Sequence, residues 1–226
     1  MTAPMLERTP EPELMDSVEQ VDAYAGADFA ESNQQFVDTL VERLAARSGP
    51  GTLIDLGCGP GDICIRLALG LPGWTIEGAD AGPNMLATAR RSVDELGLGD
   101  RIRLVLARLP DAGLAQRTYD CVVSNSLLHH LPEPDVLWQT VRELAAPGAC
   151  VQVMDLARPD SIGDARQLVE RYAADEPEVL RTDFENSLHA AWRVDEVQAQ
   201  LERAGLPLEC EKVSDRHWMV SGWLDE

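Results

Sequence analysis

Lysine is almost absent from this chain of 226 residues, in which Lys212 is the single example. Lysine and arginine together number 19 against 39 aspartates and glutamates, so the formal net charge is -20 at pH 7. A surface of that sign repels phosphate backbones. The short basic pairs Arg90-Arg91 and Arg101-x-Arg103 each stand close to acids and form no basic patch. The composition therefore argues against DNA or RNA as a partner.

Closely spaced cysteines are lacking as well. The five cysteines form no Cys-x-x-Cys pair and stand mostly in apolar runs: Cys58, Cys64, Cys121, Cys150 and Cys210. Disulfide frameworks and zinc sites show characteristic cysteine spacings that this chain does not have. We expect these side chains to be small, buried and reduced.

Long apolar runs are also missing. No segment approaches the length that crosses a bilayer. Residues 1–12 are rich in proline and glutamate and have no apolar core of a signal peptide. We therefore expect a cytoplasmic protein with no membrane insertion. Hydrophobic residues make up 45% of the chain, as in an ordinary globular protein, and the length suits one domain with a modest addition.

What the chain does have is a glycine-rich turn between a strand and a helix. Residues 53–56, Leu-Ile-Asp-Leu, form an apolar strand, and Gly57, Gly59 and Gly61 follow it at alternate positions. Apolar residues at spacings of three and four from Ile63 onward predict a helix directly behind the turn. Glycines without side chains let a ligand lie against the backbone, and the free N–H groups of the helix N-terminus face it.

An acid follows the turn at a diagnostic distance. A second predicted strand, residues 74–79, ends at Asp80, which is 80 − 61 = 19 residues after the last glycine of the turn. A carboxylate placed about that far along, at the end of the next strand, accepts both ribose hydroxyls of a nucleotide. On this observation alone the ligand is either an adenosyl compound or a dinucleotide.

The glycine spacing separates these two ligands. A dinucleotide-binding turn has the pattern Gly-x-Gly-x-x-Gly, and its third glycine would fall on Asp62. The pattern Asp55-x-Gly-x-Gly-x-Gly instead resembles motif I of the class I S-adenosylmethionine-dependent methyltransferases, and Asp80-x-x-x-x-Met85-Leu resembles their second motif. The resemblance covers residues 50–223 and implies S-adenosyl-L-methionine as the cofactor.

The resemblance also implies which residues hold this cofactor. Asp55 would bind glycine N–H groups or, through water, the cofactor's ammonium group, and Met85 would lie beside the adenine. The family places an acid after the third strand to accept from the adenine amino group, but this chain has Ala107-Arg108 there; either Asp111 substitutes or backbone groups bind the adenine. The expected cofactor-binding residues are Asp55, Gly57, Cys58, Gly59, Gly61, Asp80, Ala81, Met85, Ala107, Arg108 and Asn125.

A fourth predicted strand, residues 119–124, leads into Asn125-Ser-Leu-Leu-His129-His130-Leu. This stretch resembles the fourth-strand motif of small-molecule methyltransferases, in which a histidine sits above the methyl group. The fifth strand, residues 149–154, ends at Asp155 on the same sheet edge. A carboxylate beside an imidazole orients the ring and favours its charged form. We therefore expect His129 and Asp155 to act as general base and orienting residue, the alternative being that both histidines only pack or cap.

No metal site is predicted, because His189 and His217 are remote and no residues have ligand spacing. The expected fold is α/β, a Rossmann-like seven-stranded mostly parallel sheet with helices on both faces and an antiparallel C-terminal hairpin. Around it we expect a flexible tail (residues 1–12), an N-terminal helical lid (13–48) and a methyltransferase domain (49–226) with a substrate-pocket insertion at about 158–192. The candidate substrate contacts are Tyr24, Asn33, Arg181 and Asn186.

The predicted function is transfer of a methyl group to a small, uncharged or cationic acceptor. Two alternatives stay open: a nicotinamide-dependent oxidoreductase, which the glycine spacing disfavours, and a cofactor-binding protein without catalysis. The sequence does not specify the acceptor atom, the substrate or the oligomeric state.

Overall fold

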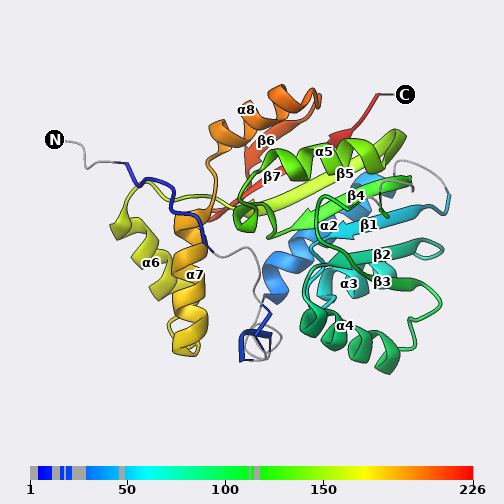
Figure 1. The fold of residues 1–226 in the computed structure, drawn as a ribbon, viewed down its shortest axis with the longest axis horizontal. Helices are drawn as coiled ribbons and strands as arrows, with labels where there is room; N and C mark the ends of the chain where they lie inside the picture. The colour runs from blue at the N-terminus through cyan, green and yellow to red at the C-terminus, as the bar shows by residue number, and fades with distance from the viewer. Residues whose placement is uncertain are drawn as a thin grey trace.

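The computed structural model describes residues 5–11, 16–17, 19–21, 29–45, 49–111, 113–114 and 118–225. Within these ranges, 7 strands form one sheet in the order β3-β2-β1-β4-β5-β7-β6 (Figure 1). The strands are β1 (Thr52–Leu56), β2 (Thr75–Asp80), β3 (Ile102–Leu106), β4 (Tyr119–Asn125), β5 (Ala145–Leu156), β6 (Glu209–Lys212) and β7 (His217–Trp223). β1 to β5 pair in parallel, whereas β7 is antiparallel to both β5 and β6. The predicted fold class is confirmed, including the C-terminal hairpin.

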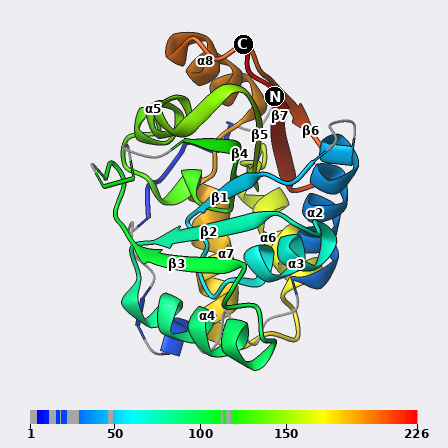
Figure 2. The same cartoon turned by 90° about the vertical axis from the view of Figure 1, so that its right-hand side faces the viewer.

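Helices cover both faces of this sheet (Figure 2). One face packs against α2 (Ala30–Ala45), α3 (Asp62–Gly70) and α4 (Pro83–Glu95), and the other against α5 (Asp135–Leu144) and α8 (Val194–Ala204). In β1, Leu53 packs in the apolar cluster on the face of α2, α3 and α4, and its neighbour Ile54 packs in the cluster on the face of α5 and α8. Both side chains are fully buried. Central parallel strands are apolar on both sides because helices cover both faces.

Two further helices stand beyond the carboxyl edge of the sheet, on the left of Figure 1: α6 (Ile162–Tyr172) and α7 (Glu178–Ala190). They make a third apolar cluster, which includes Leu168, Leu188 and Leu6 of the N-terminal segment. They fall in the insertion expected at about residues 158–192. The short 3-10 helix η1 (Leu128–His130) also lies at this edge and contacts α7.

The N-terminal residues 5–11 run beside α7 (Figure 1). The amide of Thr9 donates to the carbonyl of His189 at 3.0 Å, and Arg8 Nε donates to the carbonyl of Ala190 at 2.6 Å. The flexible tail expected over residues 1–12 stays a prediction, but its residues 5–11 make specific contacts with the rest of the chain.

One strand boundary differs from the sequence-based expectation. The fifth strand was expected over residues 149–154, but β5 begins at Ala145, so Pro147 and Gly148 lie inside it. The β4–β5 register shifts there, which makes room for a proline that has no N–H to donate.

All five cysteines lie among the described residues, where they are buried free thiols. Among the described residues, no helix is long and apolar enough to cross a membrane.

Candidate functional site

A cavity of about 760 Å³ lies at the carboxyl edge of the parallel strands. Its wall is formed by the glycine turn after β1, the ends of β2 and β4, the start of α2, η1, and side chains of α6 and α7. Parallel strands bind ligands along this edge because the loops and helix N-termini converge there. A volume of this size suits a site that holds one or two small molecules.

The glycine turn presents bare backbone to the cavity. Gly57, Gly59 and Gly61 have φ angles of 74°, 52° and 87°, a region that side chains other than glycine rarely adopt. A Cβ on Gly59 would meet nothing within 4 Å, so its backbone faces open space. A Cβ on Gly61 would lie 3.0 Å from the Cβ of Ala89, so this glycine instead allows α3 to pack closely on α4.

Asp80 closes the other side of this turn. Its Oδ2 accepts from the amide of Gly59 at 2.8 Å, and its Oδ1 accepts from the amide of Gly82 at 2.7 Å. Burial raises the pKa of the Asp80 carboxyl, which these two amides partly counteract. Each carboxylate oxygen keeps a second lone pair, so Asp80 can still accept from a pair of hydroxyls on a ligand in the cavity.

Asp55 lies deeper, at the floor of the cavity. Burial raises its pKa to about 7, and its Oδ2 accepts from Cys64 Sγ at 3.3 Å. Its Oδ1 is buried without a hydrogen-bond partner. The structure corrects one of its two expected roles: the amides of Gly57 and Cys58 donate to the carbonyl of Ala79, and not to Asp55. The second role, toward a ligand's ammonium group, fits the unpartnered Oδ1.

Asn33 and Asn125 join α2 to the cofactor side of the cavity. Asn33 Nδ2 donates to Asp62 Oδ2 at 2.8 Å, and Asn125 Nδ2 donates to Asn33 Oδ1 at 3.2 Å. The Oδ1 of Asn125 is buried and has no hydrogen-bond partner. Ser126, the next residue, has a φ of 59°, a conformation that non-glycine residues adopt at some cost and often at functional sites. Asn33, expected to contact substrate, therefore lies against the cofactor half.

The cavity wall contains all but one of the expected cofactor-binding residues. The exception is Gly61, which packs against Ala89 of α4 and does not line the cavity. These donors and acceptors fit an adenosyl cofactor. Asp111 is not part of the wall: its Oδ1 accepts from the amides of Gly113 and Leu114 at 2.7 and 3.2 Å. Of the two ways considered for binding the adenine amino group, the substitution by Asp111 is thus disfavoured.

The two expected catalytic residues are in direct contact. His129 Nδ1 lies 2.5 Å from Asp155 Oδ1, and the backbone amide of His129 donates to Asp155 Oδ2 at 3.0 Å. Burial alone would raise the pKa of Asp155, but the charge of His129 and its hydrogen bonds hold it below the usual value. Burial likewise opposes protonation of His129, yet the charges of Asp155 and Glu11 raise its pKa. The imidazole is therefore oriented by β5, with Nε2 as its free end.

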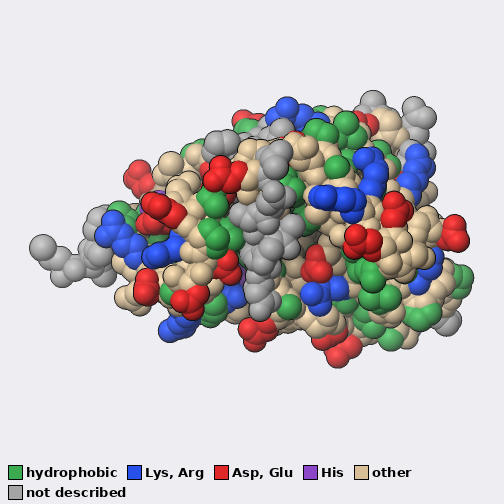
Figure 3. Space-filling view, turned by 90° about the horizontal axis from the view of Figure 1, so that it is seen from below, with side chains coloured by type: hydrophobic (Ala, Val, Ile, Leu, Met, Phe, Trp, Pro, Cys, Tyr) green, Lys and Arg blue, Asp and Glu red, His purple; other side chains and the backbone are tan. Residues whose placement is uncertain are grey.

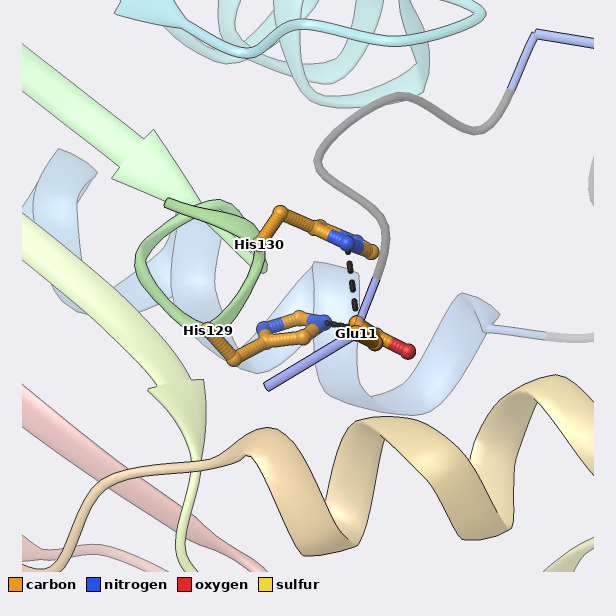
Figure 4. Close-up of side chains that lie close together, drawn as sticks. All are labelled: Glu11, His129 and His130. Atoms are coloured by element: carbon orange, nitrogen blue, oxygen red, sulfur yellow. Dashed lines mark ion pairs between the residues drawn. The ribbon is translucent and has the colours of Figure 1, made fainter. Parts of the chain in front are cut away.

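Glu11 occupies that free end, and sequence reasoning did not identify it. Its Oε1 lies 3.4 Å from His129 Nε2 and 3.0 Å from His130 Nδ1 (Figure 4). Ser187 Oγ of α7 donates to both of its oxygens, at 3.1 and 3.3 Å. Glu11 stands more than a hundred residues before His129, so no spacing in the sequence connects them.

The insertion contributes a different face from the one expected. Leu180, Asp183, Phe184 and Ser187 of α7 line the cavity, at the three- and four-residue spacing of one helix face. Two candidate substrate contacts lie on other faces of the same helix and outside the wall: Arg181 pairs with Glu170 at 3.6 Å, and Asn186 is exposed. Tyr24, the remaining candidate, falls outside the described residues.

The sequence matches the family described as "Methyltransferase domain" over residues 54–151. It is 28% identical to Methyltransferase GfsG from Streptomyces halstedii over 181 residues, which are 80% of this chain and 61% of GfsG. It is 38% identical to Trans-aconitate 2-methyltransferase from Mycolicibacterium gilvum over 108 residues, 47% of this chain and 38% of that protein. The chain thus spans less than two thirds of these relatives.

Among solved structures, the fold is similar to that of a SAM-dependent methyltransferase from Aquifex aeolicus, with a TM-score of 0.70 and 16% identity. This similarity covers 93% of this chain and 100% of the other. At that identity it concerns the fold alone.

Proposed function

We propose that this chain, which belongs to the class I S-adenosylmethionine-dependent methyltransferases, transfers the methyl group of that cofactor to a small-molecule acceptor. The single observation that carries the proposal is the cavity itself. One continuous space joins the glycine turn and Asp80 at one end to His129, His130 and the cavity face of α7 at the other. When bound, S-adenosylmethionine supplies an electrophilic methyl group on a sulfonium sulfur.

At the cofactor end, the chain's own groups bind and orient. Asp80 accepts from the ribose hydroxyls, Asp55 Oδ1 and the bare backbone of the glycine turn hold the amino-acid part, and Met85 packs beside the adenine. Much of the catalytic effect expected of such a site comes from aligning two reactants and excluding water. The enclosing helices α6 and α7 support that role, because they cover the carboxyl edge where the two ligands would meet.

At the acceptor end, the lining favours an uncharged or cationic molecule. Leu180 and Phe184 supply apolar surface, while Asp183 and Glu176 supply carboxylates. The main positive charge at this end is Arg216, whose guanidinium carbon lies 3.5 Å from the centre of the Tyr172 ring. A carboxylate-rich acceptor, such as the one named for the trans-aconitate relative, would face like charges here.

The nucleophile would lose its proton beside His129. Asp155 acts as the positioning residue, since it contacts both Nδ1 and the backbone amide of His129. The general-base hypothesis for His129 also needs an accessible Nε2, and in this arrangement Nε2 faces Glu11. The identity of the group that activates the nucleophile therefore depends on the whole cluster and not on His129 alone.

We also propose that the lid expected over residues 13–48 covers the cofactor. Asp16 Oδ1 accepts from the amides of Asn84 and Met85 at the start of α4, at 3.0 and 3.1 Å, which is the place of a helix N-cap. Asn33 bonds Asp62 on the other side of the cavity. Asp16→Ala should increase the rate at which the cofactor dissociates severalfold. An unchanged rate would contradict the proposed lid.

Calorimetry tests the function. S-adenosylmethionine and S-adenosylhomocysteine should bind with dissociation constants in the micromolar range, about -8 kcal/mol, and NAD should not bind. With labelled cofactor, neutral and cationic small molecules should be methylated in preference to polycarboxylates. Tight NAD binding without cofactor binding would support an oxidoreductase. Cofactor binding without turnover across a broad acceptor panel would support a binding protein.

A further inference from the structure

Three metal-binding side chains converge where the N-terminal segment meets η1. The carboxylate of Glu11 and the imidazoles of His129 and His130 bring one donor atom each to within 4.8 Å of one another. In Figure 4 both rings are directed at the carboxylate, His130 from above and His129 from the left. Exposed fractions are 7%, 3% and 14% for the three side chains, so this is a buried cluster and not a group of surface acids.

The spacing suits a common bound ion. Nitrogen and oxygen ligands bind Zn²⁺ at about 2.0–2.2 Å, so neighbouring ligands in a tetrahedral or octahedral shell lie about 3.0–3.5 Å apart. Glu11 Oε1 lies 3.0 Å from His130 Nδ1 and 3.4 Å from His129 Nε2. Two imidazoles and one carboxylate are also a donor set that catalytic zinc sites use, with a further position left open.

The surroundings have the features of an outer coordination shell. Asp155 accepts on Nδ1 of His129, which leaves Nε2 as the nitrogen with the available lone pair, and Ser187 donates to Glu11. Metal-binding histidines typically have such a carboxylate on their second nitrogen, and metal-binding carboxylates are themselves hydrogen-bonded. His130 Nδ1 is buried and makes no hydrogen bond of ordinary geometry, although Glu11 is close to it.

The charge of the cluster favours a dication. Glu11, Asp155 and the cavity residue Asp183 carry negative charge, and Arg8, whose Nη2 donates to the carbonyl of His129 at 3.1 Å, supplies one positive charge. One divalent ion would neutralise the two negative charges that remain.

We propose that Glu11, His129 and His130 bind one divalent transition-metal ion of the zinc type. This inference rests on the proposed function for its role: the ion's open position faces the acceptor. An acceptor hydroxyl would donate an oxygen lone pair to the ion and release its proton to water, leaving an oxygen nucleophile at neutral pH. His129 then acts as a ligand whose Nε2 lone pair is engaged, and the ion replaces it as the activating group.

The test uses the full chain, freed of metal by chelation, and Zn²⁺ or Co²⁺ alone as the probe. Calorimetry and elemental analysis should give one ion per chain, and Co²⁺ should show the absorption of a nitrogen–oxygen site. Glu11→Gln and His130→Gln should each weaken binding at least about 100-fold, and Asp155→Asn about 10–100-fold. Glu7→Gln, an exposed carboxylate on the same segment, and His189→Gln on α7 are the matched controls and should bind as the native chain does.

Binding of S-adenosylhomocysteine to the metal-free chain is measured in parallel. It reports the cofactor half and the fold of each variant independently of the ion, so failure of the metal site is distinguishable from failure of the proposed function. The proposal is overturned if the native chain binds no stoichiometric ion, if Glu11→Gln binds it equally well, or if Co²⁺ shows thiolate charge-transfer absorption that places the ion at a cysteine. Glu11 would then be only an ionic partner of the two histidines.

Discussion

Asp155 holds the ring of His129 with one carboxylate oxygen and the backbone of His129 with the other. The Oδ1 atom lies 2.5 Å from Nδ1, and Oδ2 accepts from the amide at 3.0 Å. The amide of Leu156 donates to Oδ1 as well, at 2.7 Å. Because β5 fixes the carboxylate, both the position of η1 and the orientation of the imidazole depend on a residue that is 26 positions away in sequence.

The first prediction concerns His129. Replacing His129 by Ala should reduce turnover by about 10²–10⁴-fold, because the cluster that activates a protonated nucleophile loses one of its members. The affinity for S-adenosylhomocysteine should stay nearly unchanged, since the ring lies at the acceptor end of the cavity. Single-turnover methyl transfer and calorimetry measure the two effects. His189→Ala on α7 is the control. Equal rates for the native and His129→Ala proteins would show that the His129 ring has only a packing role.

The second prediction concerns Asp80. Asp80→Ala should weaken cofactor binding by about 2–3 kcal/mol, because two ribose hydroxyls lose a charged acceptor and the amide of Gly59 loses its partner. Titration calorimetry gives the dissociation constant, and circular dichroism checks that the variant folds. Asp94→Ala, an exposed acid on α4, should change nothing. An unchanged constant in folded Asp80→Ala would place the ribose elsewhere.

The third prediction is a pH dependence of stability from Asp55. Burial raises its pKa in the folded chain to about 7, from an ordinary value of 3.8. The folded chain therefore binds more protons than the unfolded chain between those values, and this contribution to the free energy of unfolding falls as pH rises from about 4 to 7, by about 4 kcal/mol at most. Denaturant unfolding should show that slope disappear in Asp55→Asn. Glu95→Gln, an exposed acid on α4, should retain it.

The fourth prediction has the opposite sign and concerns His217. Burial, and then the charge of Arg216, lower its pKa from 6.5 to about 4. The unfolded chain binds more protons in that window, so this contribution is lost as pH falls from about 6.5 to 4, by about 3 kcal/mol. The two groups oppose each other, so His217→Gln should make stability fall more steeply as pH rises from 4 to 6.5. A His217→Gln profile parallel to the native one would contradict the buried, neutral imidazole.

Local features of the sequence were sufficient to predict residues that line the part of the cavity beside the glycine turn. The strand before Gly57, the alternate glycines and the acid 19 residues beyond them form one strand–turn–helix–strand unit, whose geometry depends on neighbours in the chain. The parallel part of the sheet was predicted from the same alternation of strands and helices, whereas the C-terminal hairpin was implied by the resemblance to the family. The boundary between α5 and β5 was harder to predict from the sequence, because β5 accommodates Pro147 through a register shift next to Tyr119 of β4.

The acceptor half was decided by the tertiary structure. Arg181 and Asp183 are two residues apart on one helix, and only the packing of α7 on η1 and the N-terminal segment turns Asp183 toward the cavity and Arg181 toward Glu170. Glu11 reaches His129 and His130 because residues 5–11 bond to α7 and to Asp160, just before α6. Convergence of distant side chains depends on how elements pack. A periodic pattern reports which face of an element is buried, but not which other segment covers it.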